Sequence, residues 1–375
     1  MRILHIYKDY YPVLGGIENH VRSLAEGQVA AGHSVTVLVT SLTRHTEEVE
    51  FNGVRVVKAA RLATVASTPL SLALPLWLRR LPADIAHLHF PYPVGEVALW
   101  LAGRARRTVV TYHSDVVRQA GLLRVYRPLM RRLLRRADRI LATSPQYAAS
   151  SPYLTENADR VTIVPLGVDL APFLAADEAG RETLRARYGT PLLLFMGRLR
   201  YYKGLHVLLH ALALVPEARL VVAGSGPLGA EWQALAGRLG LADRVHFVGD
   251  VSDAQQRALY QAADVYVLPA THRSEAFGVA LVEAMASGAP VITTEIGTGT
   301  SYVNQHGVTG LVTPPNDPPA LAQAVRDLLA DPDRRQRLGQ AARARAQAEF
   351  DRPTMLARVE TVYQAVLRHS PPGEV

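Results

Sequence analysis

The chain has 375 residues, a net charge of +8 and no cysteine, with 49% hydrophobic and 20% charged residues. This composition excludes disulfides, thiolate zinc sites and a cysteine nucleophile, and the length favours two domains over one. No apolar run reaches the roughly 18 residues that cross a bilayer, and no small-residue cleavage site follows the first residues. We therefore expect a cytoplasmic protein.

Short β-branched segments alternate with helical segments along the first half, a pattern typical of parallel sheets covered by helices. A long helix is expected over residues 18–32, after the first strand, and a linker over residues 171–180. The expected strands span residues 2–7, 34–40, 54–57, 85–89, 108–113, 139–143 and 161–164.

The second half repeats this alternation and ends in two helices, over residues 334–349 and 353–367. Its expected strands span residues 191–197, 219–223, 244–248, 265–268, 290–293 and 310–312. The sequence therefore predicts an α/β protein with two doubly wound, Rossmann-like domains, over residues 1–168 and 169–352. Ligands of such sheets bind beyond the carboxyl ends of the strands, so we expect the site in a cleft between the domains.

The net positive charge lies entirely in residues 1–169, and much of it falls on one expected helix, residues 122–136. Apolar residues recur there at helical spacing and arginines occupy most other positions. Two interpretations stay open: a solvated helix face, or a surface for anionic lipid headgroups. Nucleic acid is not expected as a partner, because aromatic residues are sparse there and no nucleic-acid motif is present.

A dinucleotide-type glycine pattern follows the expected strand 219–223, as Gly224-Ser-Gly226-Pro-Leu-Gly229. It does not open a domain, and Pro227 stands where amides would face a pyrophosphate. We interpret it as a tight turn that borders a nucleotide.

The turn after the strand 191–197 carries Arg198 and Lys203, two cations suited to a diphosphate. A solvated loop would explain a lone arginine and lysine equally well. However, the chain has only three lysines, Lys8, Lys58 and Lys203, and otherwise uses arginine. This bias favours a role for a compact ammonium group at Lys203.

Two carboxylates flank an expected helix start in Glu275-Ala276-Phe277-Gly278-Val279, with Glu283 inside the helix. Carboxylates accept hydrogen bonds from sugar or ribose hydroxyls, and amides at a helix N-terminus bind phosphate. A capping acid and an ordinary helix-face acid would give the same spacing, so both interpretations stay open.

In the first half, Gly15 and Gly16 precede the long helix, where paired glycines let a ligand approach the backbone. His113 ends the strand 108–113 and would reach the same edge, although a lone strand-end histidine is often structural. No spacing of ligands supports a metal site.

Together these segments, in this order, resemble the family 4 (group 1) retaining glycosyltransferases of bacterial polysaccharide and glycolipid synthesis, which have the GT-B fold. The resemblance also covers Val164-Pro-Leu-Gly-Val-Asp169 and Gly288-Ala-Pro-Val-Ile. It implies that the helix about 353–375 crosses back to complete the first domain, which takes the acceptor, whereas the second domain binds the donor.

The resemblance also implies roles for the site residues. Arg198 and Lys203 would hold the donor's diphosphate without a metal or other cofactor. Glu275 would contact the transferred sugar, and His113 would lie near its reacting face. The remaining donor-binding positions would be Gly15, Gly16, Gly224, Val248 and Gly249 at the base, Ala276, Phe277, Gly278, Val279, and Glu283 at the ribose.

The run Gly297-Thr-Gly-Thr-Ser-Tyr-Val-Asn304 resembles members that use GDP-mannose or related GDP-sugars, although UDP-glucose users share the core motifs. The expected acceptor is a glycan or lipid-linked glycan, with the protein peripheral on the inner face of the membrane. The alternatives are another GT-B enzyme, a phosphorylase or epimerase, and a non-catalytic nucleotide-sugar binder.

Overall fold

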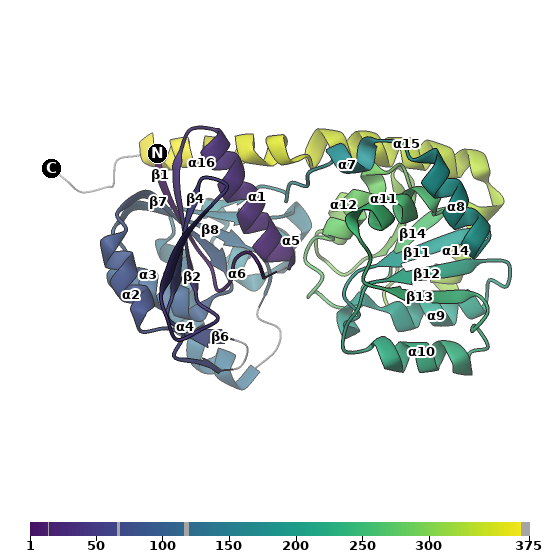
Figure 1. Ribbon diagram of the computed structural model, residues 1–375, viewed down its shortest axis with the longest axis horizontal. Helices are drawn as coiled ribbons and strands as arrows, with labels where there is room; N and C mark the ends of the chain where they lie inside the picture. The colour runs from purple at the N-terminus through teal and green to yellow at the C-terminus, as the bar shows by residue number, and fades with distance from the viewer. Residues whose placement is uncertain (14, 66–67, 116–119, 369–375) are drawn as a thin grey trace. The chain divides into compact units, whose positions relative to one another are not determined.

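The computed structural model describes residues 1–13, 15–65, 68–115 and 120–368, with the backbone alone for 120–125. The contacts divide the chain into two compact units. The first consists of Met1–Gly167 with Arg352–Val375, and the second of Val168–Asp351. Each unit is a sheet between layers of helices (Figure 1).

The first unit contains an eight-stranded sheet in the order β10–β9–β8–β7–β1–β2–β4–β3. Its neighbours pair in parallel, except that β3 runs antiparallel to β4 at the edge. The strands are β1 (Arg2–Ile6), β2 (Ser34–Thr40), β3 (Glu47–Phe51), β4 (Val54–Ala59), β7 (Ala83–Phe90), β8 (Ala105–Tyr112), β9 (Arg139–Ala142) and β10 (Val161–Ile163). A separate small hairpin joins β5 (Ala63–Val65) and β6 (Thr68–Leu70).

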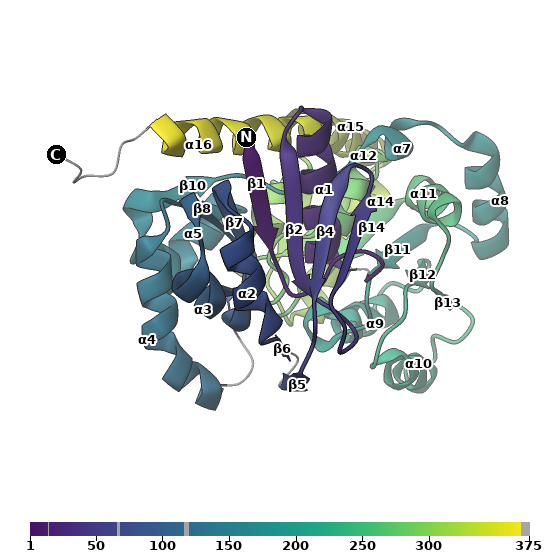
Figure 2. The same cartoon turned by 60° about the vertical axis from the view of Figure 1, so that its left-hand side comes forward.

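Helices cover both faces of this sheet. The first long helix, α1, and the last helix of the chain, α16, pack on one face, and α2, α3 and α4 cover the other (Figure 2). The helices of this unit are α1 (Gly16–Ala30), α2 (Ala73–Arg80), α3 (Pro93–Ala102), α4 (Ala120–Arg136), α5 (Pro145–Ser150), α6 (Pro152–Thr155), the 3-10 helix η1 (Ala158–Arg160) and α16 (Arg352–Arg368).

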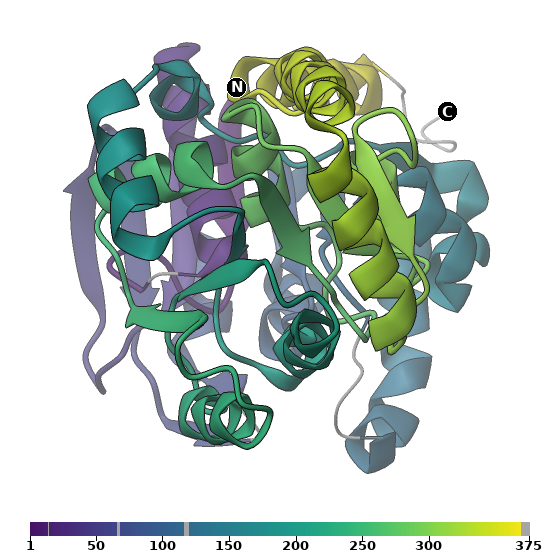
Figure 3. The same ribbon diagram turned by 90° about the vertical axis from the view of Figure 1, so that its right-hand side faces the viewer.

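The second unit contains a six-stranded parallel sheet in the order β13–β12–β11–β14–β15–β16, with helices on both faces (Figure 3). The strands are β11 (Leu192–Met196), β12 (Arg219–Ala223), β13 (Val245–Gly249), β14 (Val265–Leu268), β15 (Val291–Thr294) and β16 (Gly310–Thr313). The helices are α7 (Ala171–Leu174), α8 (Glu178–Tyr188), η2 (Tyr201–Lys203), α9 (Leu205–Ala213), α10 (Gly229–Arg238), α11 (Asp253–Ala262), α12 (Val279–Ala286), α13 (Thr300–Val303), α14 (Pro318–Ala330) and α15 (Pro332–Glu349).

The central strands of the second unit are apolar without alternation because helices bury both of their faces. Every residue of β11, Leu-Leu-Leu-Phe-Met, is buried. Side-chain caps fix where several helices begin: Ser252 and Gln255 form a capping box at α11, and Asp317 accepts from the amide of Ala320 at α14. Local sequence therefore determines the ends of these elements, and burial determines their packing.

Most expected elements are present, with shifted ends. The helix expected at residue 18 begins at Gly16, and the last helix spans Arg352–Arg368. The expectation of a linker over residues 171–180 was wrong, because α7 and the start of α8 occupy it. Asp177 caps α8 by accepting a hydrogen bond from the amide of Gly180, so acidic residues interpreted as linker begin a helix.

Each sheet has a topological switch point, where the strand order reverses and the connections leave in opposite directions. In the second unit it lies between β11 and β14, and in the first between β1 and β7. Loops that follow these strands are therefore the positions at which a ligand of each sheet would bind.

Candidate functional site

The switch point of the second unit brings together Lys203 and Glu275, which are far apart in the sequence. Lys203 follows β11 and Glu275 follows β14. The Nζ of Lys203 lies 2.6 Å from Oε2 of Glu275, and their side chains are only 12% and 9% exposed. A nearly buried ion pair thus stands at the carboxyl edge of this sheet.

Gly204 lets the two loops approach each other. Its φ is +72°, and a Cβ at this position would lie 1.8 Å from the backbone oxygen of Pro269, which follows β14. Only glycine fits such an approach. The pair Lys203-Gly204 therefore places the ammonium group against the loop that carries Glu275.

Lys203 stays charged despite its burial. Burial lowers its pKa, but the attraction of Glu275 and the smaller contributions of Tyr202 and Glu283 outweigh this effect, so the pKa is raised above its ordinary value. A protonated ammonium group with further hydrogens to donate is what an anionic ligand requires at this position.

The loop that carries Glu275 is held by hydrogen bonds to the backbone of Glu275. The amide of Glu275 donates to the carbonyl of His272, and its own carbonyl accepts from Oγ1 of Thr298 at 2.7 Å. Gly278, with a φ of +92°, then turns the chain into α12. The side chain of Phe277 is buried and contacts the ring of Phe350, so only its backbone is available to a ligand.

Glu283 lies one turn into α12 and already has two partners. Its Oε2 accepts from Nε2 of Gln256 at 2.9 Å and from the hydroxyl of Tyr260 at 2.8 Å. Burial raises its pKa to about 7, although these two hydrogen bonds and the charge of Lys203 act in the opposite direction. Among the described residues no donor reaches Oε1, so this oxygen is left for a ligand hydroxyl.

The remaining turns of this edge pack against each other through glycines. A Cβ on Gly224 would lie 2.3 Å from the carbonyl oxygen of Gly197, and the amide of Gly224 donates to the carbonyl of Gly249 at 2.7 Å. The glycine pattern therefore serves close packing of the turns after β11, β12 and β13. Arg198, beside Gly197, is exposed, and no ion pair to it is found among the described residues.

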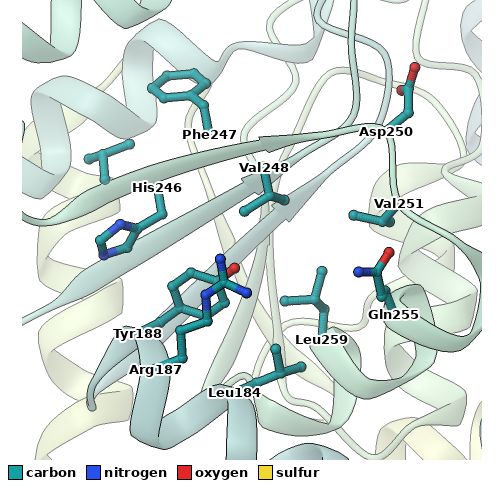
Figure 4. A pocket seen from close by; sticks show the side chains of 11 residues that line it. Leu184, Arg187, Tyr188, His246, Phe247, Val248, Asp250, Val251, Gln255 and Leu259 are labelled. Carbon is teal, nitrogen blue, oxygen red and sulfur yellow. The ribbon is translucent and has the colours of Figure 1, made fainter.

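Val248 lines a cavity of about 630 Å³ at the free edge of the sheet (Figure 4). The cavity lies between α8, β13 and α11, and Arg187, Tyr188 and His246 contribute its polar groups. Asp250, the residue after Gly249, also lines it and accepts a hydrogen bond from Oγ of Ser225. The base contact expected at Val248 and Gly249 stays a prediction.

In the first unit, Gly15 and Gly16 open α1 without a side-chain cap. A Cβ on Gly15 would lie 2.2 Å from Oε2 of Glu18, whereas a Cβ on Gly16 would meet nothing within 4 Å. Glu18 also lies 3.8 Å from Nζ of Lys8. Gly15 therefore makes room for Glu18, whereas the space beside Gly16 is open.

His113 belongs to a cluster of five buried histidines, of which only His113 was expected from the sequence. His5 on β1, His87 and His89 on β7, and His113 after β8 lie on one face of the sheet because these strands are neighbours. His20, from α1, packs edge-on against the rings of His89 and His113.

The histidine cluster predicts a loss of stability in acid. Burial lowers the pKa of His5 to about 4 and that of His20 to about 3, and holds the pKa of the other three well below the ordinary value. The unfolded chain binds these protons near pH 6.5 and the folded chain does not, so stability is present above that pH and is lost as the pH falls below it. We expect the free energy of unfolding to fall by about 1.4 kcal/mol per pH unit for each histidine.

Two buried carboxyl groups change the free energy of unfolding with pH in the opposite direction to the histidines. Burial raises the pKa of Glu96 and of Glu283 to about 7. The stability that their protonated forms contribute is therefore present below about pH 4.5 and is lost as the pH rises to about 7. Urea unfolding at several pH values between about 7 and 5 measures the net slope. A free energy of unfolding that is constant over this range would contradict neutral, buried histidines; replacing the exposed His45 by asparagine is the control and should leave the slope unchanged.

Two family models match the chain. The model described as "Glycosyltransferase Family 4" matches residues 14–172, and the model described as "Glycosyl transferases group 1" matches residues 177–345. Together they cover most of both units, including Gly15, Gly16, His113, Lys203, Glu275 and Glu283.

Several curated proteins and solved structures are similar to this chain. D-rhamnosyltransferase WbpZ of Pseudomonas aeruginosa is 42% identical over 93% of this chain and 92% of its own. O-antigen chain mannosyltransferase C of Escherichia coli is 38% identical over 98% and 99%. The structure of sucrose-phosphate synthase from Thermosynechococcus elongatus has a TM-score of 0.83 at 26% identity, over 98% of this chain and all of that one. These likenesses confirm the expected GT-B fold with two Rossmann-like domains.

Proposed function

The chain belongs to the family 4 and group 1 glycosyltransferases, and we propose that it transfers a hexose from a nucleoside diphosphate sugar, with retention of configuration, to a glycan or lipid-linked glycan in polysaccharide synthesis. The observation that carries this proposal is the buried pair of Lys203 and Glu275 at the switch point of the second unit.

Lys203 supplies positive charge where the diphosphate leaves. In sugar transfer the bond between the anomeric carbon and the diphosphate oxygen breaks, and negative charge develops on that oxygen. The ammonium of Lys203 and the exposed guanidinium of Arg198 stabilise this charge, with the amides at the start of α12. These groups supply the stabilisation that a divalent cation gives other transferases.

Glu275 has one oxygen engaged by Lys203 and one, Oε1, with no partner in the described part of the chain. A carboxylate can only accept hydrogen bonds, so its natural ligand here is a hydroxyl group of the sugar. Its charge also favours the positive character that the anomeric carbon acquires. We assign no covalent nucleophile to the reaction.

The names of two curated relatives support a choice of donor sugar. One is named for D-rhamnose and the other for mannose, and D-rhamnose is 6-deoxymannose, so both sugars share the manno configuration. We propose that the donor is a GDP-sugar of manno configuration. UDP-glucose is the alternative donor that the experiment has to exclude.

The donor is tested by measuring nucleoside diphosphate release from GDP-mannose, UDP-glucose and ADP-glucose, with lipid extracts of polysaccharide-producing bacteria as acceptors. Release of GDP that depends on the extract supports the proposal, and phosphate-dependent cleavage would favour a phosphorylase. Tight GDP binding without release under any condition would favour a non-catalytic binder.

We also propose that the first unit contacts the membrane through α2, α3 and α4, because its surface there is both apolar and basic. Leu72 and Leu76, at and in α2, are 75% and 56% exposed, and Leu101 on α3 is 63% exposed. On α4, Met130 and Leu134 are buried, whereas Arg127, Arg132, Arg135 and Arg136 are exposed; the side chains of Leu122 and Arg124 lie outside the described residues. No helix in the described part of the chain is long and apolar enough to span a bilayer.

Replacing Arg132, Arg135 and Arg136 by glutamate is expected to weaken binding to vesicles with anionic lipid by about 10²-fold or more, since each cation near such a surface contributes about 1 kcal/mol. Vesicle flotation measures this loss. The same exchange at the exposed Arg181, Arg238 and Arg337 of the second unit is the matched control. Equal loss in both triple variants would mean that net charge alone matters.

A further inference from the structure

A chain of hydrogen bonds runs through buried imidazole rings and ends at His113. Oε1 of Gln28, on α1, lies 2.7 Å from Nε2 of His5. Nδ1 of His5 lies 3.0 Å from Nε2 of His89, and Nδ1 of His89 lies 3.0 Å from Nε2 of His113. His5 and His89 thus each use both ring nitrogens, for two different neighbours.

Gln28 sets the direction of this chain. Its oxygen faces His5, and a separation of 2.7 Å suits an N–H group donating to oxygen. His5 therefore carries its proton on Nε2, and because a neutral imidazole has a single N–H, its Nδ1 accepts from His89. By the same rule Nδ1 of His89 accepts from Nε2 of His113.

A side branch agrees with this direction. The amide nitrogen of Gln28 donates to the hydroxyl of Tyr363 on α16, and that hydroxyl donates to Nδ1 of His87 at 2.5 Å. Nε2 of His87 then donates to Oγ1 of Thr111 at 2.6 Å. Burial lowers the pKa of all these histidines, so each ring is neutral and carries one proton.

His113 is consequently left with an unprotonated Nδ1, for which no hydrogen-bond partner is found among the described residues. We propose that the chain Gln28–His5–His89 fixes His113 as its Nε2–H tautomer, so that Nδ1 is a neutral acceptor for a hydroxyl of the transferred sugar. This inference rests on the proposed function, and on the position near the transferred sugar that the family resemblance implies for His113. Gln28, His5 and His89 act as positioning residues.

The fixed tautomer has a chemical consequence. A nitrogen that can only accept cannot bind a phosphate oxygen or a carboxylate, which are acceptors themselves. The opposite tautomer, or a protonated ring, would attract the diphosphate. His113 would therefore select the sugar hydroxyl against the phosphates, and leave the diphosphate to Lys203 and Arg198.

A bound metal ion is the competing interpretation of this cluster. His20, His89 and His113 each offer a nitrogen within 4.8 Å of the others, and the buried Nδ1 of His20 has no partner. A metal there would have to replace the hydrogen bond between His89 and His113, which is already satisfied at 3.0 Å. The hydrogen-bonded chain accounts for more of the ring nitrogens and is the interpretation we adopt.

Long-range ¹H–¹⁵N NMR of the histidine rings, in the free full-length protein, tests the tautomer directly. The expected result is a protonated Nε2 and an unprotonated Nδ1 for His113, assigned with a His113→Asn variant. A protonated Nδ1 would overturn the proposal, as would stoichiometric zinc in the purified protein with metal-bound nitrogen shifts. This readout needs no activity, so it is independent of whether the proposed transfer occurs.

A pair of variants links the tautomer to catalysis. Gln28→Met removes the acceptor for His5 at similar volume, and we expect mixed tautomers at His113 and a fall in kcat/KM of about tenfold, the effect of one lost neutral hydrogen bond. Gln28→Glu places a carboxylate against His5 instead, which favours a doubly protonated His5 whose Nδ1–H donates to His89, so we expect the opposite tautomer at His113 and no recovery of activity. Inhibition by GDP should be the same in both variants. Loss of activity in Gln28→Met with an unchanged His113 tautomer would contradict the link.

Discussion

Replacing Lys203 by alanine is expected to lower kcat/KM for sugar transfer by about 10³-fold, the upper range for removal of one preorganised charge-stabilising group. The ammonium group is held in place by an ion pair, 2.6 Å from Glu275, and is nearly buried. We also expect weaker binding of GDP, because the proposed contact of Lys203 with the diphosphate is made before and after transfer. Titration calorimetry with GDP and initial-rate kinetics measure the two effects.

Loss of Lys203 also leaves Glu275 buried without its partner, which costs about 3–5 kcal/mol of stability. A double variant, Lys203→Met with Glu275→Gln, separates folding from function because it removes both charges of the pair. We expect it to regain much of the lost stability without regaining activity. Lys58→Ala, on β4 of the first unit, is the control for the loss of a lysine. Activity restored in the double variant would contradict the role of the ammonium group.

Replacing Glu275 by glutamine is expected to lower kcat/KM by about 10²–10³-fold while GDP affinity stays within a few fold. Glutamine keeps the size of the side chain and an oxygen that can face Lys203, but it loses the charge that favours the positive anomeric carbon. The expected signature is a lower kcat at nearly constant inhibition by GDP. Alanine is the poorer probe, because it would leave Lys203 without its buried partner.

Glu283→Gln is the matched control for this change, since it removes a carboxylate of the same α12 region. Oε2 of Glu283 binds Gln256 and Tyr260, and its Oε1 is the oxygen expected to hold the ribose. Because the ribose belongs to the nucleotide and not to the transferred sugar, we expect weaker nucleotide binding and a nearly normal kcat. If both glutamine variants lost GDP binding and kcat equally, the division between a sugar-contacting and a ribose-contacting carboxylate would be wrong.

The fold could be predicted from the sequence because its signals are local. Runs such as Leu192–Met196 and Val265–Leu268 are apolar and short, and glycines or prolines mark the turns beside them. The linker expected over residues 171–180 was wrong for a local reason too. Alanine and acidic residues suit either a loop or a helix start, and the deciding feature is the cap at Asp177.

The second unit's site was predicted only as separate motifs. The sequence indicated Lys203 and Glu275 as a phosphate-binding cation and a sugar-binding acid, but not that they form an ion pair. Their contact depends on β11 and β14 being neighbours and on the close approach at Gly204. Strand order is a property of the whole sheet, which no local pattern of residues determines.

The histidine cluster was missed apart from His113. A signal was present in the alternation His87-Leu-His89 and in His5, since residues two apart on a strand point to the same face. That signal predicts a cluster only once β1, β7 and β8 are known to be adjacent. The partners from α1 and α16, Gln28 and Tyr363, are separated by most of the chain and could not be paired with it.

A crystal structure with GDP-mannose, or with a slowly reacting fluorinated analogue of it, tests the proposed donor site most directly. We expect the diphosphate within hydrogen-bonding distance of Nζ of Lys203 and the guanidinium of Arg198, and a sugar hydroxyl on Glu275. A diphosphate bound away from both cations, for example in the cavity beside Val248 and Arg187, would contradict the assignment of the donor site.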